Sequence, residues 1–187
     1  KKVTPSGTNG RVANDNFGFS VAVDGDIIVA GARNQSYDSA GGNFVTAAGA
    51  AYVFYKNSGG TDNWGLVKKV TGKGTNGRNG NDNFGNAVAI SGDVIVIGAF
   101  NQDYDDIGSS SNTNTGAIYI FNKNSGGTNN WGIVAKRTNE VPPLINSLQN
   151  SSRLGRSVAI EGDVIVAGSA GYGKDSTVSG TTAANCG

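Results

Sequence analysis

The chain has 187 residues, which is long enough for a domain with its own core, and its 15 basic and 14 acidic residues give a net charge of +1. Because it has no run of basic residues, neither nucleic acid nor an anionic membrane surface is expected as a partner. It contains no histidine, which excludes Ser-His-Asp and Cys-His catalysis within these residues, so we predict that it is not an enzyme.

The 30 glycines and the many asparagines favour tight turns between short strands, because both residues accept a positive φ. No apolar stretch reaches the ~20 residues that span a bilayer, so membrane insertion is not expected. The single cysteine, Cys186, cannot form an internal disulfide. It is left as a free thiol, an intermolecular link, or half of a bridge to a cysteine beyond these residues.

The sequence repeats with a period of 67 residues. Residues 3–69 align without a gap on residues 70–136, and 41 of the 67 aligned positions are identical. For example, Asn14–Gly18 returns as Asn81–Gly85, and Trp64 returns as Trp131. A third copy starts near Arg137, lacks the later aromatic and tryptophan segments, and ends in a Gly/Ser/Thr-rich stretch. We therefore predict three related structural units, the last of them incomplete.

Each full copy contains four short runs of β-branched and aromatic residues, separated by Gly, Asp, Asn and Ser. In chain order the runs are Ser20–Val23, Ile27–Ala30, Ala51–Tyr55 and Leu66–Val70, then Ala87–Ile90, Val94–Ile97, Ala117–Phe121 and Ile133–Lys136. Asp-Gly-Asp at residues 24–26 and Ser-Gly-Asp at residues 91–93 are typical of hairpin turns. No segment longer than a turn or two has helical periodicity.

Four strands repeated at this spacing are typical of a β-propeller, whose blades are four-stranded sheets stacked around an axis. The predicted fold is all-β, a partial β-propeller of four-stranded antiparallel blades with two full blades and an incomplete third. Residues 1–69 form the first blade, with residues 1–3 as the last strand of a preceding blade. Residues 70–136 form the second blade, and residues 137–187 form the incomplete third with its Gly/Ser/Thr-rich tail.

The repeated elements resemble the FG-GAP repeat, which integrin α-subunit propellers and many bacterial secreted proteins carry. Phe-Gly stands at residues 17–18 and 84–85, residues 25–32 read Gly-Asp-Ile-Ile-Val-Ala-Gly-Ala, and residues 49–54 read Gly-Ala-Ala-Tyr-Val-Phe. A strand with Trp64 or Trp131 closes each copy. The resemblance runs from Val3 to about Gly168 and implies a propeller in a secreted or cell-surface protein.

Three features depart from the family pattern. The proline of the Gly-Ala-Pro motif is replaced by Arg33, Phe100 and Ala170 in the three copies. The calcium loop that integrin-type blades carry between their first two strands has shrunk to residues 24–26 and their equivalents, which leaves too few oxygen ligands for a dedicated site. The family's propellers usually have seven blades, more than this length allows.

An arc of two and a half blades leaves apolar faces and strand edges uncovered at both ends. Three arrangements would cover them: further blades in a longer polypeptide, copies of this chain in a ring or filament, or a partner chain. In an assembly of copies, the end strands of neighbouring subunits would pair with each other.

The long segments Arg33–Gly49 and Phe100–Gly116, between the second and third runs, are the predicted binding loops. Within them, Tyr37, Asp38 and Tyr104 are the candidate binding residues, since tyrosines beside polar groups can stack on sugar rings. The alternative is that the tyrosines are surface residues without a binding role.

Asp103, Asp105 and Asp106 are the candidate metal ligands, because three carboxylates beside Ser and Asn oxygens can hold Ca²⁺, the one cofactor considered. The alternative is a solvated acidic loop closed by Asx turns. Asp15 and Asp82, which precede the Phe-Gly pairs, are expected to cap turns rather than to bind a metal.

These features favour a binding or structural module, secreted or at the cell surface, that acts in adhesion, protein contact or assembly. Its expected partners are another protein or further copies of itself. One alternative is a carbohydrate-binding propeller that holds a glycan with its loop tyrosines. Another is a non-catalytic part of a larger secreted enzyme. Fold resemblance alone does not choose among them.

Overall fold

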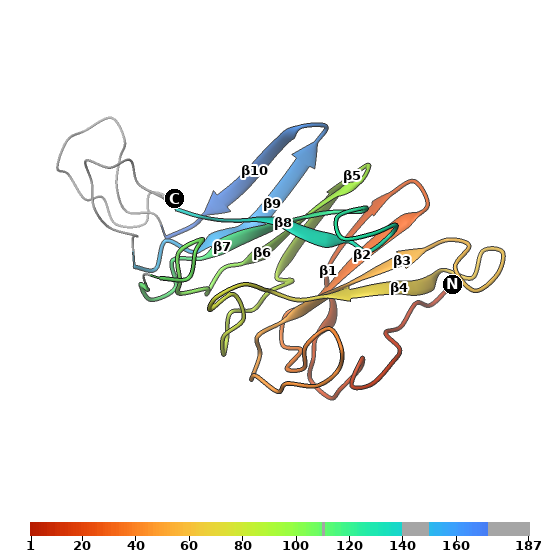
Figure 1. Ribbon diagram of the computed structural model, residues 1–187, viewed down its shortest axis with the longest axis horizontal. Helices are drawn as coiled ribbons and strands as arrows, with labels where there is room; N and C mark the ends of the chain where they lie inside the picture. Colours follow the sequence, from red (N-terminus) through yellow and green to blue (C-terminus); the bar gives the residue numbers. More distant parts are fainter. Residues whose placement is uncertain (110, 140–149, 172–187) are drawn as a thin grey trace.

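The computed structural model describes residues 1–109, 111–139 and 150–171, and these residues form ten β-strands and no helix. The strands make three antiparallel sheets of four, four and two strands, which lie side by side along the molecule (Figure 1). The predicted all-β fold of four-stranded antiparallel blades is confirmed. In the described residues, the incomplete third blade has two strands.

Blade 1 consists of β1 (Phe17–Asp24), β2 (Ile27–Ala32), β3 (Ala50–Tyr55) and β4 (Gly65–Val70), hydrogen-bonded in that order. Each neighbouring pair is antiparallel, so the sheet is a simple meander. Gly25 makes the β1–β2 turn with a φ of +50°, a conformation that glycine adopts without strain.

Blade 2 repeats this arrangement with β5 (Ala87–Ser91), β6 (Val94–Ala99), β7 (Ala117–Asn122) and β8 (Gly132–Thr138). The register repeats as well, since Ile28 is paired with Phe54 in blade 1 and Ile95 with Phe121 in blade 2. All eight runs predicted from the sequence lie within these strands.

The third blade is represented by the hairpin of β9 (Leu154–Glu161) and β10 (Val164–Ser169). Residues 140–149, the Gly/Ser/Thr-rich tail after residue 171 and Cys186 lie outside the described residues. Residues 1–16 contain no strand, and Val3 packs on blade 1. The assignment of residues 1–3 to a preceding blade therefore stays a prediction.

The largest apolar core lies between blades 1 and 2. Val29 and Val53 of blade 1 cluster there with Ile95, Tyr119 and Phe121 of blade 2, and none of these side chains is more than 2% exposed. Because side chains alternate between the two faces of a strand, each blade uses one face of its sheet for this contact. Face-to-face stacking of sheets is therefore what holds the two repeats together.

A second, smaller core joins blade 2 to the β9–β10 hairpin. Val96 and Ile118 of blade 2 are buried against Leu154, with Val158 and Ile160 packed beside them. Blade 2 is consequently covered on both faces, whereas among the described residues blade 1 and the hairpin are each covered by a neighbouring blade on one face only.

The Phe-Gly motif sits where consecutive blades come closest. Phe84 forms a parallel bridge with Gly49, and the equivalent Leu154 bridges Gly116. Gly85 has a φ of +85°, and a Cβ at this position would overlap the carbonyl oxygen of Ala50. Glycine is thus needed in this motif both for the backbone conformation and for the close approach of the preceding blade.

Candidate functional site

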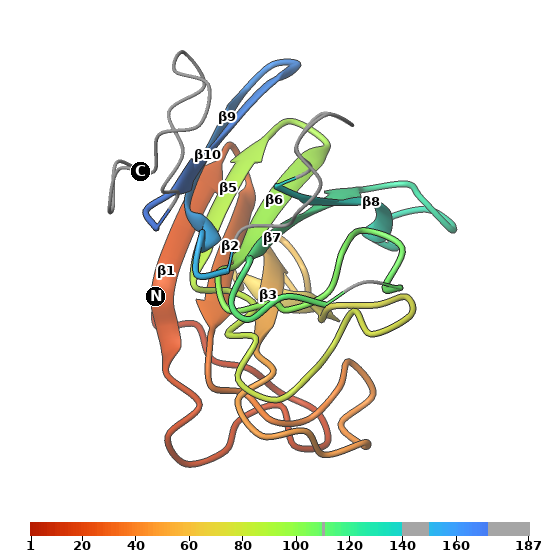
Figure 2. The same cartoon turned by 90° about the vertical axis from the view of Figure 1, so that its left-hand side faces the viewer.

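The two ends of the blades are built differently. The short turns of the β1–β2, β5–β6 and β9–β10 hairpins lie at one end, which we call the hairpin end (Figure 2). The long β2–β3 and β6–β7 loops lie at the opposite end, the loop end. All six residues singled out in the sequence belong to the loop end.

In the β2–β3 loop, Tyr37 and Asp38 contact their own loop. The Tyr37 ring packs edge-on against Phe44, with the ring centroids 5.3 Å apart. The Asp38 carboxylate accepts the backbone N–H groups of Ala40 at 2.9 Å and Gly42 at 3.0 Å. Asp38 therefore caps a turn, while Phe44 stays 61% exposed and leaves an aromatic surface at this end.

In the β6–β7 loop, Tyr104 and Asp105 occupy the positions equivalent to Tyr37 and Asp38. The Lys136 ammonium donates to the carbonyl oxygens of Tyr104 at 2.9 Å and Asp105 at 2.8 Å. Burial lowers the pKa of Lys136, and the nearby carboxylates oppose that shift. The Lys136 side chain therefore already contacts the acidic loop with its ammonium group.

Two of the three predicted calcium ligands accept hydrogen bonds from their own loop. Asp103 accepts the N–H of Asn114 at 2.6 Å, and Asp105 accepts the N–H and the hydroxyl of Ser109 at 2.8 and 2.9 Å. Within residues 1–109, 111–139 and 150–171, no three His, Cys, Asp or Glu side chains are placed to share a metal ion. The calcium site, which would also include Asp106, stays a prediction without a matching cluster.

Asp15 and Asp82 cap turns at the loop end, as expected. Asp15 accepts the N–H of Phe17 at 3.0 Å, and Asp82 accepts the N–H of Asn79 at 2.5 Å and the side-chain amide of Gln102 at 2.9 Å. Asp82 is only 3% exposed, and this burial raises its pKa from 3.8 to about 7. The carboxyl group of Asp82 is thus a structural element whose charge depends on pH.

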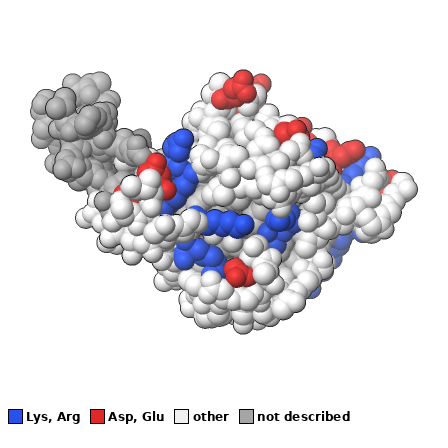
Figure 3. Space-filling view, viewed as in Figure 1, with Lys and Arg blue, Asp and Glu red and all other residues white. Residues whose placement is uncertain are grey.

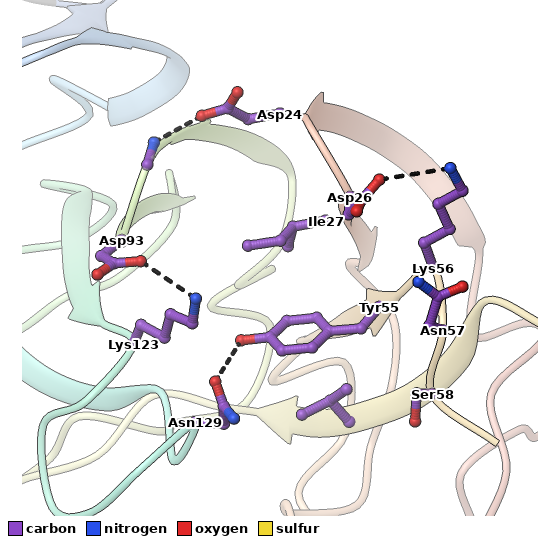
Figure 4. A pocket seen from close by; sticks show the side chains of 12 residues that line it. Asp24, Asp26, Ile27, Tyr55, Lys56, Asn57, Ser58, Asp93, Lys123 and Asn129 are labelled. Carbon is purple, nitrogen blue, oxygen red and sulfur yellow. Dashed lines mark hydrogen bonds and ion pairs between the residues drawn. The ribbon is translucent and has the colours of Figure 1, made fainter. Parts of the chain in front are cut away.

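A groove of about 760 Å³ opens at the hairpin end between blades 1 and 2 (Figure 4). Its volume falls within the range of about 300–1,000 Å³ that is usual for ligand pockets. Ile27, Tyr55 and Val67 of blade 1 supply its apolar and aromatic surface. The remaining lining is polar and comes from both blades: Asp24, Asp26, Lys56, Asn57, Ser58, Gly92, Asp93, Lys123 and Asn129.

Tyr55 is fixed across the junction of the two blades. Its hydroxyl donates to Asn129 Oδ1 and accepts from Trp131 Nε1, both at 3.0 Å. The Lys123 ammonium lies 5.7 Å from the centroid of the Tyr55 ring. Because both hydrogen-bond partners belong to blade 2, the position of the ring depends on how the two blades are stacked.

The charges at the rim of the groove are paired. Lys56 lies 3.7 Å from Asp26 on blade 1, and Lys123 lies 3.4 Å from Asp93 on blade 2. Asp24 accepts the N–H of Gly92 at 2.6 Å, which ties the two hairpin turns together (Figure 4). The groove thus offers hydrogen-bond donors and acceptors around an apolar surface without an isolated buried charge.

The sequence predicts binding residues in the long loops, and no residue of this groove was among them. A signal was present, because Tyr55 corresponds to Asn122 in the second copy, and Asn129 corresponds to Asp62 in the first. These two departures from a close repeat meet in the hydrogen bond between Tyr55 and Asn129. Departures from the repeat that face each other across a blade junction would have pointed to the groove.

The fold defines an all-β repeat protein of propeller-type blades, with a groove at the junction between two of them. The family model described as FG-GAP repeat matches residues 1–54 and 64–121, more than half of the chain. The chain belongs to the FG-GAP repeat family. A comparison with curated proteins found no match.

FG-GAP repeats usually occur in extracellular proteins, where they typically act as binding or adhesion modules. The part of the chain that the structure describes contains no helix with the length and apolar character needed to cross a bilayer. On the face shown in Figure 3, most of the surface is uncharged, and basic side chains gather in its middle with acidic ones around them. This face therefore carries charges of both signs.

Proposed function

We propose that the chain is an extracellular binding module, secreted or at the cell surface, and not an enzyme, and that the groove between blades 1 and 2 holds its ligand. One observation carries the proposal: two repeats together build a single site of about 760 Å³ with an apolar wall and a polar rim. Blade 1 supplies eight of the twelve lining residues and blade 2 the other four, so neither blade builds the groove alone.

The groove is suited to binding because its residues are already held in place. The Tyr55 hydroxyl has two partners on blade 2, and each rim lysine faces an aspartate of its own blade. A ligand that enters such a site orders few side chains, so less of the contact free energy is lost to conformational entropy. The ordered lining of the groove therefore favours ligand binding over a role as a spacer between other domains.

The ligand class that we favour is a segment of a partner protein, as in adhesion or protein contact. The groove is open, and its amides and paired charges can bond both the backbone and the polar side chains of such a segment. The two lysine–aspartate pairs lie on neighbouring blades, so a bound segment would bridge blades 1 and 2.

A specific observation favours glycan binding as the second candidate. Tyr55 places an aromatic ring beside the amides of Asn57 and Asn129 and the hydroxyl of Ser58, groups that can hydrogen-bond sugar hydroxyls while the ring contacts the sugar face. The loop residues Tyr37, Asp38 and Tyr104 offer a separate place for a glycan at the opposite end.

The test is a binding assay of the immobilised chain against a panel of glycans and extracellular-matrix proteins, with and without a calcium chelator. Tyr55→Asn places the residue of the second copy in the first and should weaken the binding of the captured ligand by about tenfold or more. Tyr104→Ser, at the loop end, is the matched control and should leave the affinity unchanged.

Unchanged affinity in Tyr55→Asn, or a panel without any ligand, would contradict the groove as the binding site. Loss of binding in Tyr104→Ser or upon chelation would instead locate the ligand in the loops. The unfolding midpoint of each variant shows whether a loss of binding is a loss of folded protein.

A further inference from the structure

We propose that the loop end of the junction between blades 1 and 2 binds a sulfate group of an acidic glycan, held by Lys68, Lys69 and Lys73. The proposal does not depend on the groove at the hairpin end or on its ligand. It rests on a cluster of basic side chains around one connected space, and on a buried ammonium group that has few partners within the protein.

The site lies between two segments that meet at the blade junction. A pocket of about 360 Å³ separates the β2–β3 loop from the segment that joins β4 to β5. Asp38 and Asn43 line it from the loop, and Lys73 and Arg78 line it from the segment. Arg78 ties the two together, because its guanidinium donates to the carbonyl oxygens of Ser36 at 2.7 Å and Asn43 at 2.9 Å. The pocket therefore lies inside the arc of described blades and not at either of its ends.

A narrow cleft adjoins this pocket and shares part of its lining, including Lys73. Lys68 and Lys69 of β4 line the cleft as well. With Arg78, four basic side chains surround the connected space, and Asp38 is the one carboxylate among the described residues that line it. An anion that enters this space therefore meets a net positive charge, which attracts it.

The Lys69 ammonium is buried with few partners. Lys69 is 8% exposed, and its hydrogen bond to the carbonyl oxygen of Asn9 is 3.5 Å long. An ammonium group has three N–H donors, and a charge that leaves water without partners costs free energy. The pKa of Lys69 is lowered to about 8, first by burial and then by the charge of Arg78, while Asp38 and Asp15 oppose the shift. A bound anion would supply the negative charge and the acceptors that this ammonium lacks.

The equivalent lysine of the second copy shows how such a group is satisfied within the protein. Lys136 is 7% exposed, and it donates to the carbonyl oxygens of Tyr104 at 2.9 Å and Asp105 at 2.8 Å. Both lysines lie 5.8 Å from the centroid of a tyrosine ring of their own blade, so the ring contact does not distinguish them. Blade 2 therefore provides acceptors that blade 1 leaves open at Lys69.

The segment that carries Lys73 is held in place by its neighbours. The Tyr119 hydroxyl donates to the carbonyl oxygen of Gly77 at 2.8 Å, and the Asn76 side-chain amide donates to that of Gly108 at 3.0 Å. The Lys73 side chain itself is exposed. A ligand would consequently order one flexible lysine and little of the backbone, which keeps the entropic cost of binding low.

The chemistry of the lining favours a sulfate carried by a sugar. Ammonium groups bind sulfate oxygens through charge-assisted hydrogen bonds. The hydroxyls of Ser39 and Thr71 and the amides of Asn43 and Asn79 line the same pocket, whose described lining includes no apolar side chain. Such a lining can bond sugar hydroxyls, but it offers no apolar contact to the side chains of a peptide. Its volume of about 360 Å³ is also within the range of about 300–1,000 Å³ that is usual for ligand pockets.

The test is isothermal titration calorimetry of the 187-residue chain with four probes: a sulfated heparin hexasaccharide, its desulfated counterpart, inorganic sulfate and inorganic phosphate. The sulfated hexasaccharide should bind more tightly than either free ion, and added sodium chloride should weaken its binding. The desulfated hexasaccharide should not bind. A sulfated hexasaccharide that fails to bind, whether or not the free ions do, or equal binding of the two hexasaccharides, overturns the proposal.

Single-charge variants locate the site. Lys68→Gln and Lys73→Gln should each weaken binding of the sulfated hexasaccharide by about tenfold, because each removes a charged donor. Lys1→Gln is the matched control and should leave the affinity unchanged. Lys1, the equivalent of Lys68, makes the same kind of hydrogen bond to an asparagine, at 3.0 Å against 2.9 Å, but it does not line the site. An equal loss in Lys1→Gln would show attraction to the overall charge of the chain and would overturn the proposal.

Lys69→Met is the decisive variant, because it separates binding from stability. It should weaken binding by about tenfold or more and leave the urea midpoint unchanged or higher, since it removes a buried charge whose hydrogen bond is long. Lys136→Met removes the equivalent charge together with two shorter bonds, so it should lower the urea midpoint and keep the affinity of the folded protein. If Lys69→Met binds like the wild type, or loses as much stability as Lys136→Met, the proposal is wrong.

Discussion

Blades 1 and 2 are nearly the same sheet in two different surroundings. Their strands, turns and register repeat, yet Val21 on β1 is 68% exposed and its equivalent Val88 on β5 is 8% exposed. Phe17 is half-buried, whereas Phe84 is 1% exposed. The repeat in sequence therefore determines the sheet, and the neighbouring blade determines how much of each side chain leaves water. Equivalent substitutions should differ in effect wherever the neighbours differ, and only there.

The largest difference is expected for the phenylalanine of the Phe-Gly motif. Both rings pack on two aromatic rings of their own blade, at 5.6 and 6.1 Å for Phe17 and at 5.2 and 6.0 Å for Phe84. Only Phe84 also has a complete blade behind it. Phe84→Ala should lower the free energy of unfolding by about 3–5 kcal/mol and Phe17→Ala by about half as much, measured by denaturant titration. Equal losses would show that the preceding blade does not cover Phe84.

Asp82 should make stability depend on pH. Its pKa in the folded state, about 7, lies above its ordinary value of 3.8, so between those values the folded chain holds a proton that the unfolded chain has lost. The free energy of unfolding should therefore fall as pH rises from 4 to above 7. Asp82→Asn removes this term, and at pH 8 it should be the more stable protein by on the order of 2–4 kcal/mol. Parallel stability–pH curves for the two proteins would contradict the burial of an ionisable group at this position.

Gly85 and Gly18 separate the effect of the backbone from that of the neighbour. Their φ values are +85° and +81°, so alanine costs about the same conformational free energy at each position. Only at Gly85 would the added Cβ overlap another blade, at the carbonyl oxygen of Ala50. Gly85→Ala should thus be the more destabilising by about 1–3 kcal/mol, measured by thermal unfolding. A smaller loss for Gly85→Ala than for Gly18→Ala would mean that the blades are not in contact there.

The smallest effects should come from the rim lysines, which pair with exposed aspartates of their own blades. Lys56 lies 3.7 Å from Asp26 and Lys123 lies 3.4 Å from Asp93, and both aspartates are more than half exposed. Exposed ion pairs contribute about 0.2–1 kcal/mol, so Lys56→Ala and Lys123→Ala should each cost less than about 1 kcal/mol. Urea midpoints measure both losses, and a loss well above about 1 kcal/mol at either lysine would contradict the assignment of these contacts as exposed ion pairs.

Much of the fold could be predicted because the strands are specified locally. Alternating apolar runs and the Gly-Asp turns at residues 25–26 and 92–93 determine each hairpin without reference to the rest of the chain. The stacking of blades was also predictable, since the Gly-Ala segments of β2 and β6 allow close approach.

Side-chain partners in the loops could not be predicted from the sequence. Gln35 and Gln102 are fully buried, and each donates to a tyrosine hydroxyl of its own blade at 3.1 Å. Nothing in their polar, glycine-rich surroundings indicates burial, because the loop folds back over them. Asp38 and Asp105 illustrate a second limit: a loop aspartate can accept a backbone N–H or hold a cation, and the sequence pattern is the same for both.

The groove could not be predicted from the sequence for a different reason. Its lining comes from the turns of two blades, and residues such as Tyr55 and Asn129 are 74 positions apart in the chain. Only the stacking of the blades brings them together, so no local motif records the site. A comparison of the two copies position by position is the closest that sequence analysis comes to it.

The most direct test of the account is amide hydrogen exchange of β1 and β5 in the isolated chain, at a concentration where its mass is 19.0 kDa. Both strands pair with one neighbour in their own sheet, but within the part of the chain that the structure describes only β5 lies between two blades. The stacked arrangement predicts that the amides of β5 exchange at least about tenfold more slowly than the equivalent amides of β1. Equal exchange in the two strands would contradict it, because the two copies would then have the same surroundings.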